Sequence, residues 1–455
     1  MTVSTTLRAR LRELPLAAIA ACLLSFAAFW MAQRAANVTM LDLSVYRAEG
    51  ETVLAGGDLY AMRATSANLP TTYPPFAALL FTPLTLLGVP EMRTLATAGN
   101  LLLLLALVHL SLRLVGRDRP GTALWAAAVL VWCEPVWTTL RYGQINLLIA
   151  VAVLWDLTRR ENNRWAGVGI GLATAVKLTP GLFVVLLVAV GVVRARAGGF
   201  RSGWNPWLRQ AATATGTFVA VTVASAVVLP YDSRRFWTHM IFETSRVGRK
   251  EETANQSLNG VLARLLHTTD PGVWWLIAAV VVGVAGLTVA VRAALRGDRP
   301  VAVVACATTA LLVSPISWSH HWVWCVPALV LLATRVRPVW TAATALVFAS
   351  FALWWVPHAP APVRLELHQN GWQMLLSGLY TLVGLALLYA SGSGALGTAR
   401  EDRPAGGAVA DTEAPPVSAQ GVPAQDVPAQ DVPAQDVPAQ GAAARGVTAQ
   451  AVAKE

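Results

Sequence analysis

The feature that most constrains this chain is a long succession of apolar segments, each about as long as a bilayer is thick, separated by short polar loops. A membrane helix needs roughly 20 mostly apolar residues, with a range of about 17–25. Only 13% of the residues are charged, against about 25% in a soluble domain. A chain with so little polar surface cannot face water on all sides. The sequence therefore predicts an all-α, polytopic membrane protein.

We expect about twelve membrane-spanning helices. The candidate segments are 14–33, 95–115, 121–139, 145–158, 165–178, 179–193, 210–230, 272–294, 301–316, 322–334, 338–356 and 372–391. Arg8, Arg10 and Arg12 precede the first segment, and no small-residue cleavage site follows it. We therefore interpret that segment as a retained anchor rather than a signal peptide.

The distribution of arginines orients these segments, because cytoplasmic loops of membrane proteins carry the excess of positive charge. Arginine-rich loops at 113–119, 159–164, 194–209, 292–299 and 335–337 are expected to be cytoplasmic. Four segments then lie outside, at 34–73, 140–144, 231–271 and 357–371. The junctions near Lys177 and near 317–321 fall on the same outer side.

The apolar stretch 74–89 does not fit this alternation. It contains Pro74, Pro75 and Pro83, and counting it as a crossing would place the arginines at 113–119 outside. We therefore predict that it is re-entrant or interfacial, and we expect interfacial helices in the first outer loop.

The remaining compositional features exclude several classes of protein. The net charge of +10 lies in short loops between apolar segments, which argues against nucleic acid as a partner. Four cysteines lie inside apolar runs and are interpreted as packing residues. Residues 1–391 form the predicted transmembrane domain. Residues 392–455, with Val-Pro-Ala-Gln-Asp repeats between Val422 and Gln440, are predicted to be a disordered cytoplasmic tail.

Asp42 is the main candidate for acid–base chemistry. It follows the end of the first apolar segment by nine residues, which is about 14 Å if the link is helical. That distance keeps its carboxylate near the bilayer surface, where the phosphate of a lipid lies. A carboxylate there can accept a proton from a hydroxyl group. A helix cap or an ion pair with Arg47 is the structural alternative.

Basic residues on the predicted outer side are candidates for binding phosphate. Lys177 is one of only three lysines and lies where two apolar segments meet. A lysine is a compact partner for phosphate, although a buried ion pair is an alternative. The 231–271 loop carries positive charge despite facing outward, which indicates an anionic partner, either lipid headgroups in general or one bound phosphate. Its candidates are Arg246, Arg249 and Lys250.

Two adjacent histidines, His320 and His321, lie at a predicted helix junction on the same side. Neighbouring residues of a helix point in different directions, so the pair does not predict a shared metal site. One of them can donate to a phosphate oxygen or assist Asp42. Packing among the surrounding tryptophans is the alternative. The sequence has neither a glycine-rich nucleotide loop nor Cys–His metal spacing, so we expect no cofactor and no metal.

Several polar residues on the outer side are candidates for binding sugar hydroxyls. Gln144 and Asn146 join two helices there, although a polar connection explains them equally well. Asp58 follows two glycines and is more typical of a turn. The full set of candidate sugar- and acceptor-binding residues is Tyr46, Asp58, Tyr73, Gln144, Asn146, Asn255 and Asn259.

Six short motifs, spread over about residues 10–391 and all on one predicted side of the membrane, resemble glycosyltransferase family 87, whose members are membrane enzymes of the GT-C type. The motifs are Asp42-Leu-Ser-Val-Tyr46-Arg, Tyr73-Pro-Pro-Phe, Tyr142-Gly-Gln-Ile-Asn146, Val176-Lys-Leu-Thr-Pro180, Asn255-Gln-Ser-Leu-Asn259-Gly and Ser314-Pro-Ile-Ser-Trp-Ser-His-His321.

The resemblance implies an inverting transferase in the cell membrane that uses polyprenyl-phosphate mannose and makes an α-mannoside on a lipid-linked acceptor outside the cytoplasm. It also implies that Asp42 is essential and that one histidine of the 320–321 pair takes part. Some relatives transfer arabinofuranose, so the sugar stays open. A transporter of polyprenyl-linked sugars and a polymer ligase are alternatives. The sequence shows no internal repeat of the kind that transporters often have.

Overall fold

The structure is a computed structural model that describes residues 16–160, 163–198, 203–359 and 362–397, and within these ranges its regular elements are all helices. The α-helices are α2 (Leu16–Ala35), α3 (Leu41–Leu54), α4 (Pro75–Phe81), α5 (Val89–Leu114), α6 (Pro120–Leu130), α7 (Glu134–Tyr142), α8 (Asn146–Leu157), α9 (Val168–Val176), α10 (Gly181–Ala197), α11 (Pro206–Val228), α12 (Pro230–Thr238), α13 (Leu258–Leu265), α14 (Val273–Leu295), α15 (Arg299–Val313), α16 (Cys325–Arg335), α17 (Pro338–Ala349), α18 (Gly371–Ser377) and α19 (Leu379–Ser393). The 3₁₀ helices are η1 (Thr82–Leu86), η3 (Met240–Phe242), η4 (Thr244–Arg246), η5 (Ser319–Trp324), η6 (Ala352–Trp354) and η7 (Leu365–His368). The predicted all-α fold is confirmed.

Each predicted span has a helix or a bent pair of helices at its position. In the described part, α2, α5, α11 and α14 are long and apolar enough to cross a bilayer alone, and two bent pairs raise that number to six. Others, such as α8 and α15, are apolar but shorter. The multi-pass architecture is therefore confirmed, whereas the number of twelve spans stays a prediction. The proposed tail lies outside the described residues from position 398 onward.

Two of the predicted spans are broken helices rather than straight ones. The 121–139 segment divides into α6 and α7, which meet at 77°, where Pro135 follows Glu134 in the first turn of α7. The 372–391 segment divides into α18 and α19, which meet at 69°. A break frees backbone groups that water cannot satisfy inside a membrane. At the second break Gln256 accepts from the Tyr380 amide and donates to the Ser377 carbonyl.

The stretch 74–89 folds back without crossing. It forms α4 and η1, which together extend roughly 20 Å, less than the ~30 Å core of a bilayer. One cavity is lined by both Arg34, from the end of α2, and Arg93, from the start of α5. The chain therefore enters and leaves the 36–88 segment at the same end of the bundle. This geometry agrees with the re-entrant or interfacial prediction.

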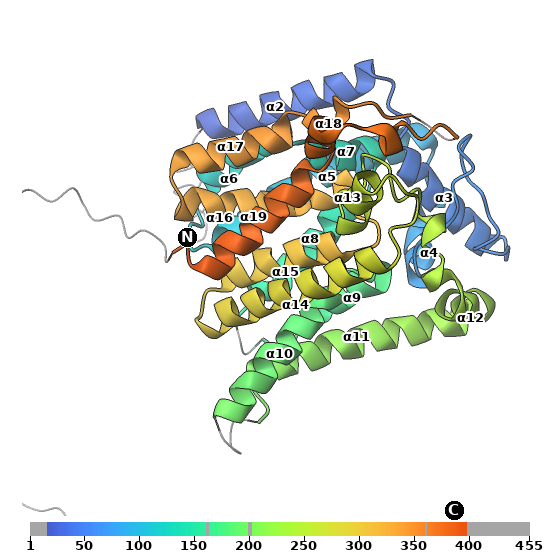
Figure 1. Cartoon of the computed structure of the whole chain (residues 1–455). Helices are drawn as coiled ribbons and strands as arrows, with labels where there is room; N and C mark the ends of the chain where they lie inside the picture. The colour runs from blue at the N-terminus through green and yellow to red at the C-terminus, as the bar shows by residue number, and fades with distance from the viewer. Residues whose placement is uncertain (1–15, 161–162, 199–202, 360–361, 398–455) are drawn as a thin grey trace, which may run out of the picture. The chain divides into compact units, whose positions relative to one another are not determined.

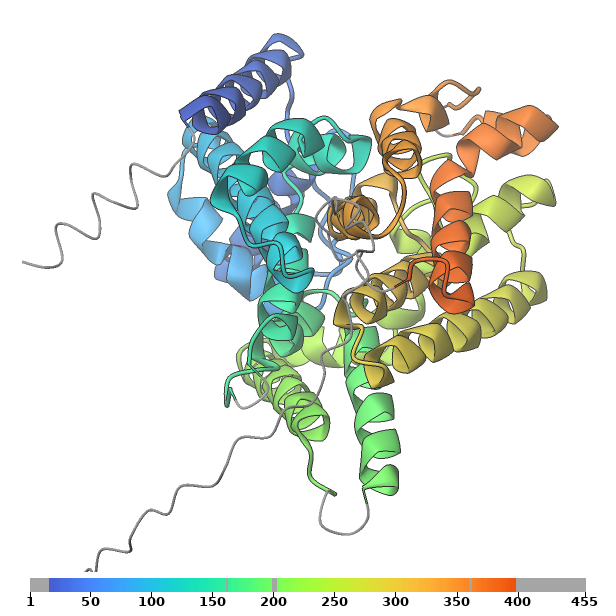
Figure 2. The same cartoon turned by 90° about the vertical axis from the view of Figure 1, so that its left-hand side faces the viewer.

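Glycines allow several helices to approach closely. A Cβ atom at Gly171 of α9 would lie 2.5 Å from the Ala214 carbonyl oxygen of α11, and one at Gly286 of α14 would lie 2.1 Å from the Thr309 hydroxyl of α15. Small residues at helix contacts are the usual means of packing in membranes, where lipid supplies no hydrophobic drive between helices. Both views of the structure show α10 and α11 packed side by side along one edge of the bundle (Figure 1, Figure 2).

Polar elements gather at one end of the bundle. Figure 1 shows α3, α4 and α12 at the right, whereas α10 and α14 end at the left. The last turns of α10 and α14 contain Arg194, Arg196 and Arg292. The two ends therefore differ in charge as the positive-inside rule requires, with the end that carries α3 opposite the arginine-rich one.

The re-entrant geometry predicts which loops share a side of the membrane. Cysteines introduced by Arg63→Cys and Glu91→Cys, both at exposed positions on either side of 74–89, should react with an impermeant maleimide from the same face. A cysteine introduced by Asp118→Cys, beyond α5, should react only from the other face. The native cysteines are buried and give little background. Labelling of positions 63 and 91 from opposite faces would show that 74–89 spans.

Candidate functional site

A cavity of about 350 Å³ lies at the end of the bundle where α3, α4 and α12 gather. We call it the α3 cavity. It is lined by one face of α3, the 69–74 segment, the loop from Met240 to Val247 and the turn before η5. The charged or titratable side chains from distant parts of the sequence that line it include Asp42, Lys177, Arg246 and His321. The structure thus brings together an acid and three basic groups that the sequence placed in four separate segments.

The face of α3 that lines the cavity is set by helical spacing. Asp42, Tyr46 and Glu49 follow one another at intervals of four and three residues, which places them on the same side of a helix. Asp42 lies in the first turn, where the helix dipole favours negative charge. Gly50 packs against η1 so closely that a Cβ atom there would lie 2.8 Å from the Phe81 carbonyl oxygen. This contact fixes α3 against the re-entrant segment.

Asp42 is held by Gln144, which links it to two tyrosines. The Gln144 Nε2 atom donates to Asp42 Oδ2 at 2.7 Å. The Tyr46 hydroxyl donates to Gln144 Oε1 at 2.8 Å, and the Tyr73 hydroxyl lies 3.3 Å from the same oxygen. The two hydroxyls therefore orient the amide so that its NH₂ group faces Asp42. Three of the predicted sugar-binding residues thus surround the predicted base.

Gln144 reaches Asp42 because of the glycine before it. Gly143 ends α7 with a positive φ of 67°, a conformation that side chains rarely adopt. A Cβ atom there would lie 2.6 Å from Leu43 Cβ. Only glycine both turns the chain and allows α3 and the end of α7 to touch.

The electrostatics of α3 leave one ionised carboxylate on its side of the cavity, which Glu243 of the 231–271 loop also lines. Burial raises the pKa of Asp42 to about 6, although the hydrogen bond from Gln144 and the charge of Lys177 partly oppose the shift. Burial, helped by the charge on Asp42, raises the pKa of Glu49 to about 8. At neutral pH Asp42 is therefore ionised while the fully buried Glu49 is protonated. Asp42 is the carboxylate with a proton affinity suited to general-base work near neutral pH.

Lys177 lies in the short link between α9 and α10. Its Nζ atom is 3.2 Å from Asn146 Oδ1 and 2.9 Å from His321 Nε2. No carboxylate of the described residues lies within ion-pair distance of it. Burial lowers the pKa of Lys177 to about 7, although the charge of Asp42 opposes the shift. The charged amine is therefore only partly populated at neutral pH, and a bound phosphate, an anion that lysine binds well, would favour it.

The structure separates the two histidines. His321 lines the α3 cavity and contacts Lys177, and its Nδ1 atom accepts from the Trp318 amide at 3.2 Å. The ring proton then belongs on Nε2, which can donate to the Lys177 amine when that amine is neutral. The His320 ring instead stands edge-on against Tyr142. Of the two, His321 is the one placed to act on a ligand in the cavity.

The predicted phosphate-binding residues of the 231–271 loop do not all reach the cavity. Arg246 lines it and donates from Nη2 to the Tyr60 carbonyl at 2.8 Å. Lys250 instead pairs with Asp270 at 2.6 Å and is not among the lining residues.

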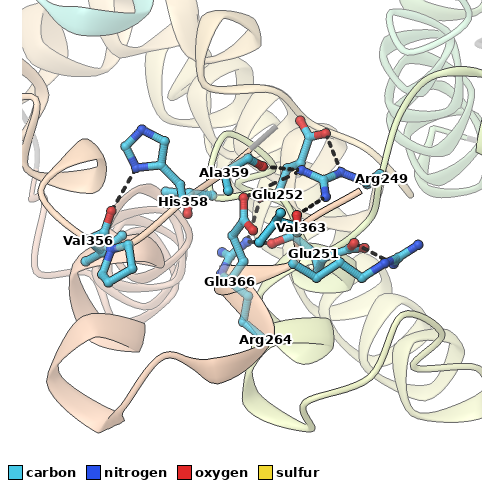
Figure 3. A network of polar contacts seen from close by, with 12 residues as sticks. Arg249, Glu251, Glu252, Arg264, Val356, His358, Ala359, Val363 and Glu366 are labelled. Atoms are coloured by element: carbon cyan, nitrogen blue, oxygen red, sulfur yellow. Dashed lines mark hydrogen bonds and ion pairs between the residues drawn. The ribbon is translucent and has the colours of Figure 1, made fainter. Parts of the chain in front are cut away.

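Arg249 belongs to a separate polar network (Figure 3). It donates to Glu252 at 3.0 Å and to the carbonyls of Val363 and Ala359 at 2.8 and 2.7 Å. Figure 3 shows its guanidinium enclosed by these groups, close to Glu366. Arg249 therefore ties the 249–264 segment to the 356–366 segment, and the structure does not bring it to the other predicted cations.

Three predicted sugar-binding residues also form structural contacts away from the cavity lining. Asp58 pairs with Arg235 and accepts from the amides of Tyr60 and Ala61, as a turn residue does. Asn255 accepts from the Ser317 amide at 3.0 Å, and Asn259 donates to the Pro315 carbonyl at 3.0 Å. These asparagines shape the turn that carries His321. Their contribution to the site is indirect.

Asn146 has a double role. Its Oδ1 atom contacts Lys177, and its Nδ2 atom donates to the His320 carbonyl at 3.1 Å. It therefore holds the lysine and the histidine turn in a fixed relation, rather than being exposed toward a sugar.

Sequence reasoning missed Glu134, which supports the histidine turn from beneath. Its carboxylate accepts from Thr138, Ser319 and Trp354 on one oxygen and from Tyr380 on the other, at 2.8, 2.8, 3.2 and 2.9 Å. Ser319 directly precedes the two histidines. The signal was present, because Glu134 is an acidic residue inside an apolar run and precedes a proline. Such a residue is rarely retained without partners.

The fold and the α3 cavity are those of a polytopic membrane enzyme. The profile of glycosyltransferase family 87 matches residues 72–315. The chain is 35% identical over 387 residues to the polyprenol-phosphate-mannose-dependent alpha-(1-2)-phosphatidylinositol mannoside mannosyltransferase of Mycolicibacterium smegmatis, a match covering 77% of this chain and 83% of the relative. The chain belongs to glycosyltransferase family 87, and the resemblance found in its motifs is confirmed.

Two further proteins are similar. A polyprenol-phosphate-mannose-dependent alpha-(1-2)-phosphatidylinositol pentamannoside mannosyltransferase of Mycobacterium tuberculosis is 35% identical over 327 residues, covering 68% of this chain and 70% of the relative. Among solved structures, ArnT from Cupriavidus metallidurans bound to undecaprenyl phosphate aligns with 84% of this chain and 77% of its own, at 15% identity and a TM-score of 0.41. That overlap is too loose to support an argument about fold or function.

The four hydrogen bonds of Glu134 predict a strong effect on stability. Glu134→Ala leaves four buried donors without an acceptor and should lower the free energy of unfolding by roughly 3 kcal/mol. Glu134→Gln keeps one acceptor oxygen and should cost less. Denaturation of the purified protein in detergent measures both. An unchanged unfolding curve for the alanine variant would contradict the role given to this residue.

Proposed function

We propose that this protein is an inverting mannosyltransferase that moves mannose from polyprenyl-phosphate mannose to a lipid-linked mannoside on the extracytoplasmic face of the plasma membrane. The single observation that carries the proposal is the placement of Asp42 and the Lys177–His321 pair on one cavity. A base for the acceptor and positive or hydrogen-bond-donating groups for a departing phosphate are the two requirements of transfer from a phosphate-linked sugar. The names of the two mannosyltransferase relatives support this choice of donor.

In the proposed reaction Asp42 accepts the proton of an acceptor hydroxyl while that oxygen forms a bond to the anomeric carbon of the donor. The bond between the anomeric carbon and the phosphate oxygen breaks on the opposite face of the sugar. The electron pair stays on the polyprenyl phosphate, which leaves as an anion. A β-linked donor thereby gives an α-linked product. Lys177, His321 and Arg246 stabilise the leaving phosphate electrostatically.

The depth of the site suits lipid substrates. Asp42 follows α2, the first apolar helix, by a short link, so the cavity lies close to the level of the headgroups. A polyprenyl phosphate brings its phosphate to that level while its chain remains in the bilayer. We infer that the acceptor also carries a lipid, and the names of the relatives favour a phosphatidylinositol mannoside and an α-(1-2) bond.

The first test concerns the base. Asp42→Asn removes the proton acceptor and keeps the size of the side chain, so kcat for mannosyl transfer should fall roughly 10²–10⁴-fold. Glu51→Gln is the matched control, because Glu51 lies on the same helix but is half-exposed and pairs only with Arg47. Radiolabelled transfer to a phosphatidylinositol mannoside in proteoliposomes measures both. Normal turnover by Asp42→Asn would end the assignment, and sugar crossing the bilayer without covalent product would favour a transporter.

The second test uses pH. The working form of Asp42 is the carboxylate, and its pKa is raised to about 6. The fraction of enzyme with an ionised Asp42 therefore falls as pH drops through about 6. Burial lowers the pKa of Lys177 to about 7, so the fraction of enzyme with a charged lysine falls as pH rises through that value. A plot of kcat/KM against pH should bend near pH 6 and decline again above about pH 7. Removing the hydrogen bond that lowers the pKa, by Gln144→Leu, should move the bend to higher pH, whereas an unmoved bend would contradict the Asp42–Gln144 contact.

The third test separates the two arginines that the sequence treated alike. Arg246 lines the cavity, so Arg246→Gln should raise KM for polyprenyl-phosphate mannose by about tenfold, the loss of roughly one charge-assisted hydrogen bond. Arg249 holds two segments together, so Arg249→Gln should lower stability and leave the donor KM near the wild-type value. If Arg249→Gln raised the donor KM and Arg246→Gln left it unchanged, the donor phosphate would lie near Arg249.

A further inference from the structure

A second cavity lies between the end of α2 and the start of α5. Its volume is about 370 Å³, and we call it the α2–α5 cavity. Its lining residues are Trp30, Gln33, Arg34, Asn37, Val38, Met40, Pro90, Arg93, Thr94 and Thr97. The set contains two arginines, two amides and two hydroxyls but no carboxylate. The cavity is therefore positive and rich in groups that can hydrogen-bond.

Several polar groups of this cavity lack partners among the described residues, although the Thr97 hydroxyl donates to the Arg93 carbonyl. In the described part of the chain, neither Arg34 nor Arg93 has a carboxylate within ion-pair distance. The buried Nε atom of Arg93 and both polar atoms of the buried Gln33 amide have no hydrogen-bond partner there. Leaving such groups unsatisfied is costly. Two unsatisfied donors, Arg93 Nε and Gln33 Nε2, beside two guanidiniums indicate a site for an anionic group that accepts hydrogen bonds.

The surroundings identify the kind of anion. The outer face of α2 is apolar and exposed, with Leu23, Leu24 and Met31 each more than 60% accessible. Only 22% of the apolar window of α2 is buried, so this helix faces lipid. Its last turn ends at the level where headgroups lie, and Trp30 beside the cavity is a typical residue of that level. A free phosphate would make no use of the apolar face of α2 beside the cavity. A membrane lipid has its phosphodiester at this depth, and its acyl chains can lie along that face.

We propose that the α2–α5 cavity binds the phosphodiester of a membrane lipid through the guanidiniums of Arg34 and Arg93 and the amide of Gln33. Arginine suits this role because its planar fork matches two phosphate oxygens. Arg93 and Thr94 lie in the second turn of α5, close to the positive end of a long helix. Glu91 lies in the first turn but does not line the cavity.

The site lies beside the α3 cavity. Met40 lines the α2–α5 cavity and Asp42, two residues later, lines the α3 cavity. In the link between α2 and α3, Asn37 and Met40 adopt left-handed conformations, with φ of 48° and 54°. The phosphodiester can belong to a bulk anionic phospholipid or to the lipid acceptor itself, and the second source rests on the proposed function.

Lipid binding by the full chain in detergent tests the site without reference to transfer. Native mass spectrometry should show one tightly bound phosphatidylglycerol on the wild type and none of comparable affinity for phosphatidylcholine. The double variant Arg34→Gln/Arg93→Gln should lower the affinity for phosphatidylglycerol about tenfold or more. The charge-matched control, Arg63→Gln/Arg234→Gln, removes two exposed arginines that line neither cavity and should bind normally. Wild-type affinity in the Arg34/Arg93 variant would overturn the proposal.

Two activity measurements distinguish the sources of the phosphodiester. In nanodiscs of phosphatidylcholine alone, a site for the acceptor predicts that Arg34→Gln/Arg93→Gln raises the KM for a phosphatidylinositol mannoside and leaves the KM for the donor unchanged. A site for bulk lipid predicts that phosphatidylglycerol stimulates the wild type and not the variant. Gln33→Leu keeps both charges and removes only the amide, so it should weaken phosphatidylglycerol binding less than the double variant does. A wild-type unfolding temperature in each variant shows that weaker binding does not come from unfolding. If all these variants bound phosphatidylglycerol and transferred mannose as the wild type does, the lipid site would be refuted and the proposed transferase activity would still stand.

Discussion

The contact between Gln144 and Asp42 is the constraint on which the arrangement of the site depends. It joins the first outer helix to the link between α7 and α8, two segments about a hundred residues apart in the sequence. The contact requires Gly143, because any side chain there would strike Leu43. Through it the acid faces the same cavity as Lys177 and His321. Tyr46 adds a second hydrogen bond from α3 to the same glutamine, so Gln144 is the polar anchor of α3.

Irregular backbone gathers around the site because chemistry in a membrane needs polar groups at helix ends. The break between α6 and α7 carries Glu134, which binds Ser319 next to the histidines. The break between α18 and α19 is satisfied by Gln256, whose backbone amide also donates to the Ser317 carbonyl at 2.7 Å. Non-helical backbone at membrane depth is tolerated only where protein or a water-filled cavity surrounds it. Both breaks meet this condition by packing against the turn that carries His321.

The sequence predicted the helices well because their signal is local. Apolar runs of membrane length located a helix or helix pair at each predicted span, whereas α3, α12 and α13 lie in the predicted outer loops. The prolines at 74, 75 and 83 indicated that 74–89 does not cross. It predicted Asp42, Lys177 and a histidine because polar residues at the ends of apolar runs are rare. It did not predict the kinks, since a proline such as Pro135 does not by itself fix an angle of 77°.

Residues in polar loops were harder to place, for a physical reason. Arg246 and Arg249 are identical in chemistry and three residues apart, yet one lines the cavity and the other binds Glu252 and two carbonyls. Asn255 and Asn259 have the amides expected of a sugar site but hold the backbone of residues 315–317. Which partner such a side chain finds depends on loops distant in sequence. Single-sequence patterns carry no information about that choice.

The most direct measurement of the central claim is a cryo-electron microscopy structure of the Asp42→Asn variant with polyprenyl-phosphate mannose bound. The account predicts that the donor phosphate lies within hydrogen-bond distance, about 3 Å, of Lys177 Nζ and His321 Nε2. It also predicts that the side chain at position 42 faces the side of the anomeric carbon away from that phosphate. A phosphate bound elsewhere, with Lys177 still in contact only with Asn146 and His321, would contradict it.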